Sequence, residues 1–267
     1  MLEEKDYPAP PEYVDFKRKV RSLTGVDLDA YKYQIHRRVH MLMQRWGMRS
    51  YDDYFNAIKN DEKRLREFLD YLTINVSEFF RNPNKFEELE ARVIPMLLEG
   101  KARRQLKAWS AGCATGEEPY SLAIIFEDLG IAREPRILAT DIDKTALAIA
   151  QKGIYAKKQL ANVSQERIAR HFTPLGDDLY EVKPHVKDRV RFQQQDLLKD
   201  PFDKDFDLIL CRNVVIYFRP EAKDMLYRKF QEALRPGGVL MVGGTEQIFN
   251  YRELGFKSAG PFLYQKA

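Results

Sequence analysis

The residues with the clearest chemical potential lie in one short segment, residues 109–121, which contains two glycines and two adjacent acids. An apolar run over residues 106–109 leads into its glycine turn, and a helix-like run over residues 119–129 follows. A strand, a glycine turn and a helix in this order hold a nucleotide-like ligand in an open α/β sheet. The turn lacks the Gly-x-x-x-x-Gly-Lys-Ser/Thr pattern that binds phosphates, and Glu117 and Glu118 would repel a diphosphate. We therefore expect a ligand with ribose hydroxyls and a positive charge.

Two more acids, Asp141 and Asp143, lie at the end of the next apolar run, residues 136–140. An acid at this point can accept hydrogen bonds from both ribose hydroxyls of an adenosine. The separation of 29 residues between Gly112 and Asp141 exceeds the roughly 20 of dinucleotide-binding folds, which predicts a longer helix and loop between them. We predict that Asp141 contacts the ligand and that Asp143 caps the helix beginning at Lys144.

Polar residues also follow two later apolar runs. After residues 190–193, a polar group among residues 194–198 could meet the adenine amine, although a helix cap or a loop would explain it as well. The run over residues 206–211 ends at Arg212 and Asn213, which would face the crevice where ligands bind in such sheets. A surface ion pair is the alternative explanation for Arg212.

Residues 73–81 are unusually polar for a segment with so many apolar residues. Asn75 and Ser77 could reach the ligand, and Arg81 could hold an anion. The alternative is a plug between two domains, in which Phe79 and Phe80 pack and Arg81 caps a helix end.

The patterns around these residues predict an α/β fold from residue 105 to residue 267. Candidate strands are residues 106–110, 136–140, 190–193, 206–211 and 239–243, and candidate helices are residues 119–129, 144–152 and 221–234. This alternation predicts a mainly parallel, Rossmann-like sheet covered by helices. Turn residues and apolar alternation at about residues 171–190 predict a small β insertion, and residues 235–238 are expected to form a turn.

The first part of the chain, residues 11–82, shows helical spacing of its apolar residues and predicts an all-helical N-terminal domain. Ser50 is expected to cap one of its helices, and residues 83–104 to form a linker helix. Between Lys17 and Arg49, nine basic residues face only two acids, a local net charge of +7 against +4 for the whole chain. This basic surface predicts an acidic partner, with an ordinary solvated helix face as the alternative.

The composition excludes several classes of protein. The 267 residues, 44% of them hydrophobic, suffice for one large domain or two modest ones. The sequence shows no run of 18 apolar residues and no apolar secretory signal, so we expect no membrane span and no export. Cys113 and Cys211 fit a reducing cytoplasm better than a disulfide framework, and the spacing of the four histidines predicts no metal site.

Five ordered stretches closely resemble the CheR chemoreceptor glutamate methyltransferases. They are residues 73–82 (TINVSEFFRN), 110–121 (SAGCATGEEPYS), 139–143 (ATDID), 211–218 (CRNVVIYF) and 243–249 (GGTEQIF). The resemblance spans nearly the whole chain and is closest to the shorter Gram-positive type. It implies a Rossmann-like S-adenosylmethionine methyltransferase sheet with an N-terminal all-helical domain and a small β insertion.

The resemblance implies S-adenosylmethionine-dependent O-methylation of glutamate side chains on chemoreceptor cytoplasmic helices, for chemotactic adaptation, with S-adenosylhomocysteine as the product. By match to the family's motifs, the cofactor contacts would be Asn75, Ser77, Arg81, Glu117, Asp141, Asp196, Leu197, Arg212 and Asn213. Ser77 stands where threonine is common. Asp196 stands where asparagine is common, which keeps an acceptor and loses a donor. Arg81 and Tyr217 are the candidates for positioning the reactants.

The basic region near Arg37, Arg38 and Arg45 corresponds to the region with which the family docks on receptor helices. We expect a cytoplasmic monomer with no nucleic-acid partner and no membrane insertion. Some family members bind a C-terminal receptor pentapeptide through a longer insertion loop. Here that loop is shorter and has one glycine, Gly176, so we expect no such tether.

Two other functions remain open at the level of sequence. A nucleic-acid methyltransferase could use the basic helix, but it would normally carry an Asn/Asp-Pro-Pro-Tyr motif, which this sequence lacks. A non-catalytic adaptor that binds S-adenosylhomocysteine or a receptor is the second alternative. The intact acids and arginines of the predicted site argue against it.

Overall fold

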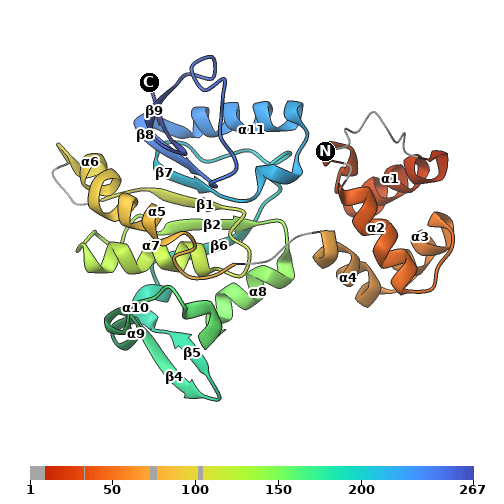
Figure 1. The fold of residues 1–267 in the computed structure, drawn as a ribbon, viewed down its shortest axis with the longest axis horizontal. Coiled ribbons are helices and arrows are strands. Elements are labelled where there is room, and N and C mark those ends of the chain that lie inside the picture. Colours follow the sequence, from red (N-terminus) through yellow and green to blue (C-terminus); the bar gives the residue numbers. More distant parts are fainter. Residues whose placement is uncertain (1–9, 33, 73–76, 102–104) are drawn as a thin grey trace. The chain divides into compact units, whose positions relative to one another are not determined.

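The computed structural model describes residues 10–267 except residues 33, 73–76 and 102–104 (Figure 1). The chain forms two compact units. One contains the chain up to residue 74 together with residues 216–224, and the other contains residues 75–215 and 225–267. We call them the helical unit and the sheet unit and describe each by itself.

The helical unit is built from α-helices with a shared aromatic core. Its helices are α1 (Pro11–Thr24), α2 (Gln34–Arg45), α3 (Tyr51–Asn60) and α4 (Glu62–Leu72), with a short 3-10 turn at Leu28–Ala30. Phe16, Tyr54 and Phe68 are fully buried and pack ring against ring. Ser50 accepts a hydrogen bond from the Asp53 amide at 3.0 Å, which confirms the predicted cap of α3.

Residues 216–224 extend the helical unit with a distant part of the chain. The Lys32 amide donates to the Tyr217 carbonyl at 2.9 Å, and the Arg219 amide donates to the Ala30 carbonyl at 3.0 Å. The ring of Phe218 lies 5.1 Å from that of Tyr31 in an edge-on arrangement. The sequence patterns had indicated no such return of the chain.

The sheet unit contains a seven-stranded sheet in the order β6-β2-β1-β7-β8-β10-β9. Its strands are β1 (Ala108–Ala111), β2 (Ile137–Asp141), β6 (Val190–Gln194), β7 (Phe206–Cys211), β8 (Leu234–Val242), β9 (Phe256–Gly260) and β10 (Leu263–Lys266). The strands from β6 to β8 pair in parallel, and β10 pairs antiparallel with β8 and β9. The strand order reverses between β1 and β7, so their carboxyl ends border the crevice in which such sheets bind ligands.

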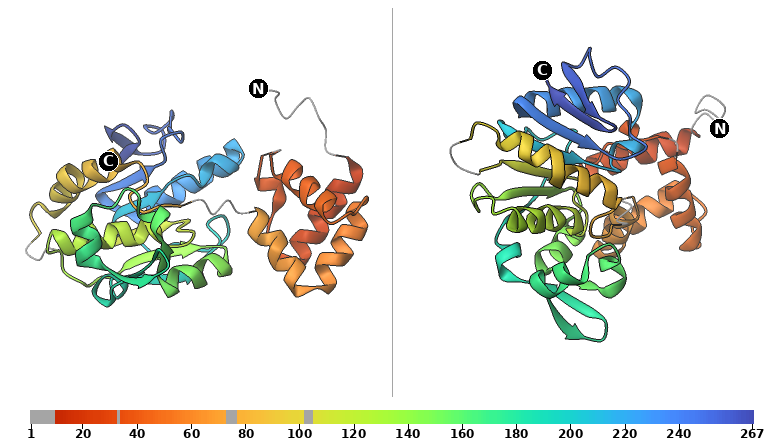
Figure 2. Two further views of the ribbon diagram at one scale, coloured as in Figure 1. Left: turned by 60° about the horizontal axis from the view of Figure 1, so that its bottom comes forward. Right: turned by 60° about the vertical axis from the view of Figure 1, so that its left-hand side comes forward.

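Helices pack on this sheet, as Figures 1 and 2 show. They are α5 (Pro83–Glu88), a π-helical turn (Leu89–Val93), α6 (Ile94–Leu98), α7 (Glu117–Asp128), α8 (Lys144–Lys152) and most of α11 (Pro220–Ala233). The strands β1 and β7 are buried along their whole length, which explains their continuous apolar runs. Of the predicted linker helix over residues 83–104, residues 83–98 are helical, with the π-helical turn in their middle.

A second, three-stranded sheet confirms the predicted small β insertion. Its order is β3-β5-β4, with β3 at Ile154–Ala156, β4 at Phe172–Gly176 and β5 at Leu179–Val182. Asp177 and Asp178 both have positive φ, as a tight hairpin turn requires. Three helical segments accompany this sheet: Lys157–Leu160, α9 (Gln165–His171) and α10 (Pro184–Lys187). The third strand, β3, had not been predicted.

Residues 235–238, predicted as a turn, lie within the bounds of β8 but bulge out of it, because the pairing with β7 passes directly from Leu234 to Val239. The register of β8 against β7 shifts between Phe206 and Leu208, and Gly237 has a positive φ of 75°. A bulge therefore accommodates the proline and glycines that had indicated a turn. Among the described residues, no helix is both long and apolar enough to span a membrane.

Candidate functional site

The loops after β1, β2 and β7 meet at the carboxyl edge of the sheet. The amides of Gly112 and Cys113 donate to the Thr140 carbonyl at 2.8 and 2.9 Å, which joins the loop after β1 to the end of β2. Gly112 has a φ of 79°, and a Cβ added there would overlap the Val214 side chain. Glycine at this position therefore permits the close approach of the loops after β1 and β7.

Asp141 lies at the end of β2 and supports the loop after β1. Its Oδ2 accepts a hydrogen bond from the Ala114 amide at 2.8 Å, and its Oδ1 accepts one from the Asp143 amide at 3.0 Å. Burial raises the pKa of Asp141, and these backbone hydrogen bonds oppose that rise. Asp143 accepts hydrogen bonds from the Thr145 and Ala146 amides, so its predicted role as the cap of α8 is confirmed.

Glu117 is fully buried at the first turn of α7. Its Oε2 accepts a hydrogen bond from the Thr115 hydroxyl at 2.7 Å, and its Oε1 accepts one from the Gln159 amide group at 2.6 Å. Gln159 lies in the 3-10 turn after β3, and its own Oε1 accepts from the Ala156 amide at 3.0 Å. Sequence reasoning missed Gln159, because no local pattern indicates a contact across 42 residues.

Glu118 and Arg212 form a buried ion pair that links the first turn of α7 to the loop after β7. The Arg212 Nη1 donates to Glu118 Oε2 at 3.3 Å, and the Ser110 hydroxyl donates to Glu118 Oε1 at 2.8 Å. Burial raises the pKa of Glu118, and the positive charge of Arg212 opposes the rise. The alternative of a surface ion pair for Arg212 was wrong, since its side chain is only 3% exposed.

Arg212 also binds the segment that carries Arg81. Its Nη2 donates to the Arg81 carbonyl at 2.6 Å and to Asn82 Oδ1 at 2.8 Å, and its guanidinium lies 5.2 Å from the centre of the Phe86 ring. Its Nε is buried and has no acceptor among the described residues. A buried donor of this kind is expected to have a partner, which makes Arg212 Nε a candidate donor to a bound anion.

The segment around Arg81 is held by backbone hydrogen bonds. The Phe79 amide donates to the Gln159 carbonyl at 3.0 Å, and the Phe80 amide donates to the Ser121 hydroxyl at 2.9 Å. Both phenyl rings are buried, as the plug alternative required. Asn82, and not Arg81, precedes the first residue of α5. Ser77 is half-buried near the start of this segment, and Asn75 lies outside the described residues.

Asp196 and Leu197 lie in the loop after β6. The Leu198 amide donates to Asp196 Oδ1 at 2.9 Å, so the Asp196 carboxylate closes its own turn, as the loop alternative proposed. The Lys229 Nζ donates to the Leu197 carbonyl at 2.7 Å and lies 4.0 Å from the centre of the Phe202 ring. Burial lowers the pKa of Lys229. Lys229 therefore fixes this loop from α11, a role that sequence reasoning missed.

Asn213 and the loop after β8 are joined through a buried acid, Glu246. Asn213 has a φ of 60°, and its amide donates to Glu246 Oε2 at 2.6 Å. The Gly243 amide donates to the same oxygen at 2.7 Å, and a Cβ at Gly243 would overlap it. The stretch 243–249, noted in the sequence only for its family resemblance, thus contacts the loop that carries Arg212 and Asn213.

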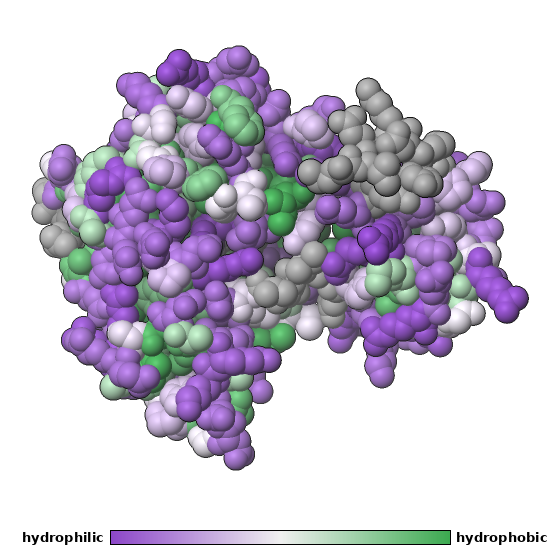
Figure 3. Space-filling view, in the orientation of Figure 1, coloured by the Kyte–Doolittle hydropathy of each residue, from purple (hydrophilic) through white to green (hydrophobic). Residues whose placement is uncertain are grey.

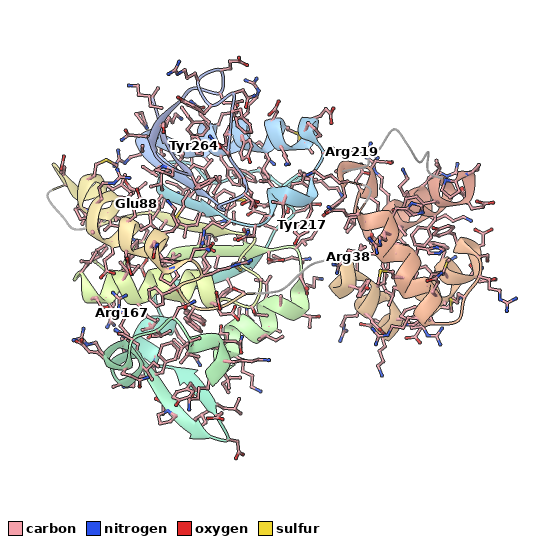
Figure 4. All side chains as sticks on the ribbon, in the orientation of Figure 1. Arg38, Glu88, Arg167, Tyr217, Arg219 and Tyr264 are labelled. Atoms are coloured by element: carbon pink, nitrogen blue, oxygen red, sulfur yellow. The ribbon has the colours of Figure 1, made fainter. Side chains whose placement is uncertain are left out.

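The helical unit holds the remaining predicted residues. Tyr217 belongs to this unit, so its predicted position near the transferred methyl stays a prediction. Arg38 donates through Nε and Nη2 to the Tyr71 carbonyl and lies 4.7 Å from the centre of the Tyr71 ring, so it fastens α2 to the end of α4 (Figure 4). Arg45 is exposed and lies 3.7 Å from Glu67. Arg37 is exposed, with no ion pair in the part of the chain that the structure describes.

The basic region is less uniformly positive than its sequence suggested, because several of its residues have acidic neighbours. The ion pairs are Lys17 with Asp29, Arg18 with Asp15, Lys19 with Asp15 and Asp52, and Arg21 with Asp27. Hydrophilic side chains nevertheless cover most of the visible face of the helical unit (Figure 3). Within the described ranges, no three His, Cys, Asp or Glu side chains form a group that could hold a metal ion.

Comparison with known proteins matches both units. The family model "CheR methyltransferase, SAM binding domain" matches residues 75–260, and "CheR methyltransferase, all-alpha domain" matches residues 11–73. Over 256 residues the chain is 42% identical to a chemotaxis protein methyltransferase of Listeria monocytogenes, covering 96% of this chain and 97% of the relative. It is 33% identical to chemotaxis protein methyltransferase 1 of Pseudomonas aeruginosa, covering 88% and 89%, and 31% identical to the Borreliella burgdorferi enzyme, covering 91% and 89%.

Proposed function

Because this chain belongs to the CheR family of S-adenosylmethionine-dependent chemotaxis methyltransferases, we propose specific roles in methyl transfer for the residues at the carboxyl edge of its sheet. The enzyme forms methyl esters on glutamate side chains of chemoreceptors. The observation that supports these roles best is the convergence of Asp141, Glu117 and Arg212 on the turn after β1.

The groups at this edge suit an adenosyl ligand with a cationic end. In both Asp141 and Glu117, each carboxylate oxygen already accepts one hydrogen bond from the protein. An ionised carboxylate has about four acceptor sites, so each of these side chains can also accept hydrogen bonds from a ligand. In our proposal Asp141 accepts from the ribose hydroxyls, and Glu117 faces the cationic end. Arg212 Nε supplies a donor for the cofactor carboxylate. Arg81 is then left to orient the incoming glutamate.

The chemistry requires positioning more than acid–base catalysis. S-adenosylmethionine, when bound, supplies a methyl group on a positively charged sulfur. The accepting glutamate has an ordinary pKa of about 4.3, so it is already ionised at pH 7 and needs no general base. Because the reaction neutralises both charges, a strongly polar site would favour the reactants over the transition state. Alignment of the two reactants can contribute roughly 7–11 kcal/mol, and we assign this task to Arg81 and Tyr217.

A methylation assay tests the activity directly. Purified receptor cytoplasmic fragments are incubated with cofactor labelled with tritium in the methyl group. Release of the label as methanol in mild base identifies a carboxyl methyl ester. A base-stable product, or label in added nucleic acid, would contradict the proposal. Binding of S-adenosylhomocysteine without any label transfer would point to the adaptor alternative.

A charge-neutral substitution tests the role of Glu117. Glu117→Gln keeps the size of the side chain but removes its charge from a fully buried position. We expect the affinity for S-adenosylmethionine to fall more than that for S-adenosylhomocysteine, because only the former carries the sulfonium charge. Calorimetry with both ligands makes the comparison, and equal losses would contradict a role near the sulfur.

The proposal also covers how the enzyme docks on its receptor. We assign the exposed Arg37 and Arg45 to attraction of an acidic receptor helix, and Arg38 to supporting the helix that carries them. We further propose a cytoplasmic monomer that works without a pentapeptide tether. Calorimetry with a peptide ending in Trp-x-x-Phe is expected to show no binding, and micromolar affinity would overturn that part. Sedimentation of the purified enzyme tests the monomer.

A further inference from the structure

The loop after β8 carries an exposed phenylalanine that the fold does not use. Phe249 is 84% exposed, the largest value among the exposed large hydrophobic side chains of the described residues. We propose that Phe249 is a substrate-contact residue that packs on the apolar seam of the receptor helix whose glutamate is methylated. The inference rests on the proposed function, since it names a further contact for the same substrate.

The loop that presents Phe249 is held by the residues just before it. Before it, Glu246 is 3% exposed and accepts hydrogen bonds from the amides of Gly243 and Asn213. Next to it, Ile248 is buried, and its amide donates to the Tyr264 hydroxyl at 2.8 Å. Figure 4 shows Tyr264 in the strands that end the chain. The loop is therefore anchored at Glu246 and Ile248, while the phenyl ring of Phe249 points into solvent.

The position of the loop favours a substrate over other occupants. It follows the carboxyl end of β8, and Glu246 connects it directly to Asn213 at the carboxyl end of β7. Substrates and cofactors of open α/β sheets approach from this edge. Phe249 therefore stands on the side of the sheet unit from which the receptor glutamate must enter, whereas exposed Ile149 lies in the middle of α8 and Leu175 lies on β4.

The chemistry of the substrate explains why an aromatic residue suits this place. Receptor cytoplasmic helices that associate with one another have apolar residues at helical spacing beside their acidic positions. A phenyl ring against such a seam contributes non-polar contact that does not weaken with salt. It complements the basic residues, whose attraction to glutamates is long-range and screened by salt. Aromatic residues also contribute a large share of binding energy at protein interfaces.

Steady-state methylation of a purified receptor cytoplasmic fragment tests the proposal. Phe249→Ala is expected to raise the KM for the fragment by roughly tenfold, since burial of a large apolar side chain is lost. The kcat, the dissociation constant for S-adenosylhomocysteine and the melting temperature are expected to stay as in the parent enzyme. Phe249→Leu is expected to recover most of the affinity. Ile149→Ala, which removes another exposed apolar side chain, serves as the matched control and should change none of these quantities.

The possible results separate this inference from the proposed function. An unchanged KM in Phe249→Ala, with an active parent enzyme, would overturn the inference and leave the function standing. A parent enzyme that does not methylate the fragment would contradict the function itself. A change in sedimentation between parent and variant would assign Phe249 to contact between two copies of the chain and would also overturn the inference. A fall in kcat or cofactor affinity would indicate that Phe249 supports the loop instead.

Discussion

Arginine–carboxylate pairs occur in both units, and they differ in what surrounds them. In the sheet unit, Arg212 and Glu118 are 3% and 14% exposed, and Arg212 makes further hydrogen bonds to Arg81 and Asn82. In the helical unit, Arg45 and Glu67 are 68% and 40% exposed, with 3.7 Å between the charged atoms. The same two residue types therefore form a rigid buried framework in the sheet unit and an exposed charged surface in the helical unit.

Burial is the physical reason for the difference. Removing one partner of a buried pair leaves an uncompensated charge in a poorly solvated place, whereas water and salt replace the partner of an exposed pair. The cofactor edge therefore depends on geometry. The basic surface depends on the sum of charges that a receptor helix meets.

The largest expected effect is on stability and comes from breaking the buried pair. Arg212→Ala is expected to lower the free energy of unfolding by about 3–5 kcal/mol, because Glu118 remains buried without its partner. Urea denaturation measures the change. Arg45→Ala is the matched control and is expected to change stability by less than about 1 kcal/mol. Similar losses in both variants would remove the basis of the comparison.

The next effect concerns the cofactor. Asp141→Ala is expected to weaken cofactor binding by roughly a hundredfold, since hydrogen bonds to a charged acceptor contribute about 1.5–3 kcal/mol each. Calorimetry with S-adenosylhomocysteine measures it. Asp143→Ala is the control: it removes the cap of α8, so it should cost about 1 kcal/mol of stability while leaving affinity nearly intact. An unaltered dissociation constant in Asp141→Ala would refute the assignment of this acid.

Substitution of Arg81 tests whether this residue positions the reactants or supports the fold. Arg81→Ala is expected to reduce methyl transfer more than about tenfold through misalignment of the reactants, while the variant stays folded. The Arg212 contact to this segment uses the Arg81 carbonyl, which the substitution preserves. If the cofactor dissociation constant is unchanged, Arg81 orients the glutamate; if it rises in parallel with the loss of activity, Arg81 holds the cofactor. Full turnover in a folded variant would exclude both roles.

A smaller effect is expected on the basic surface. Arg37→Glu is expected to raise the KM for receptor fragments severalfold at low salt, and the difference from the parent should shrink in 0.5 M NaCl because screening weakens exposed charges. Arg38→Ala should instead lower stability by about 1 kcal/mol, since its guanidinium binds the Tyr71 carbonyl. A salt-independent effect of Arg37→Glu would argue against electrostatic docking.

The smallest effect concerns pH, and it compares two partly buried acids, Asp128 with a side chain 13% exposed and Asp15 with one 33% exposed. Burial would raise the pKa of Asp128, but hydrogen bonds from His171, Arg167 and Arg170 lower it, while burial lowers the pKa of His171. Both shifts favour the native state at neutral pH, so stability should fall as the pH drops below about 6.5, where unfolded histidine gains a proton. It should fall further as the pH drops through the lowered pKa of Asp128.

The more exposed counterpart is Asp15, whose pKa is lowered by hydrogen bonds from Lys19 and Arg18. Carboxyl titration by NMR in 0.1 M and 1 M NaCl compares the two acids. We expect the pKa of Asp15 to return toward its ordinary value in high salt and that of Asp128 to stay low, because the less exposed group is screened less. Equal salt sensitivity would show that the two environments do not differ as proposed.

Much of the site could be predicted because its chemistry follows strand ends. Asp141, Arg212 and Asn213 each come directly after an apolar run, and the sheet brings such positions to one edge. The strand over residues 206–211 and the helix over residues 144–152 have the predicted bounds. Gln159 and Lys229 could not be found in this way, since they bind the site from a 3-10 turn and from α11.

Local patterns by themselves determined the two classes of structure, the glycine turn, the caps at Ser50 and Asp143, and the set of acids and arginines available for chemistry. Each of these features depends on a repeat or a spacing of a few residues. Local backbone geometry converts such a spacing directly into a helix, a strand, a turn or a cap. Only the tertiary structure decided that Glu118 pairs with Arg212 across 94 residues, that Gln159 holds Glu117, and that residues 216–224 join the helical unit. Such contacts form when the fold closes distant loops and buries their polar groups. These contacts form because buried polar groups need hydrogen-bonding partners, and no spacing of nearby residues in the sequence indicates which distant partner a group will have.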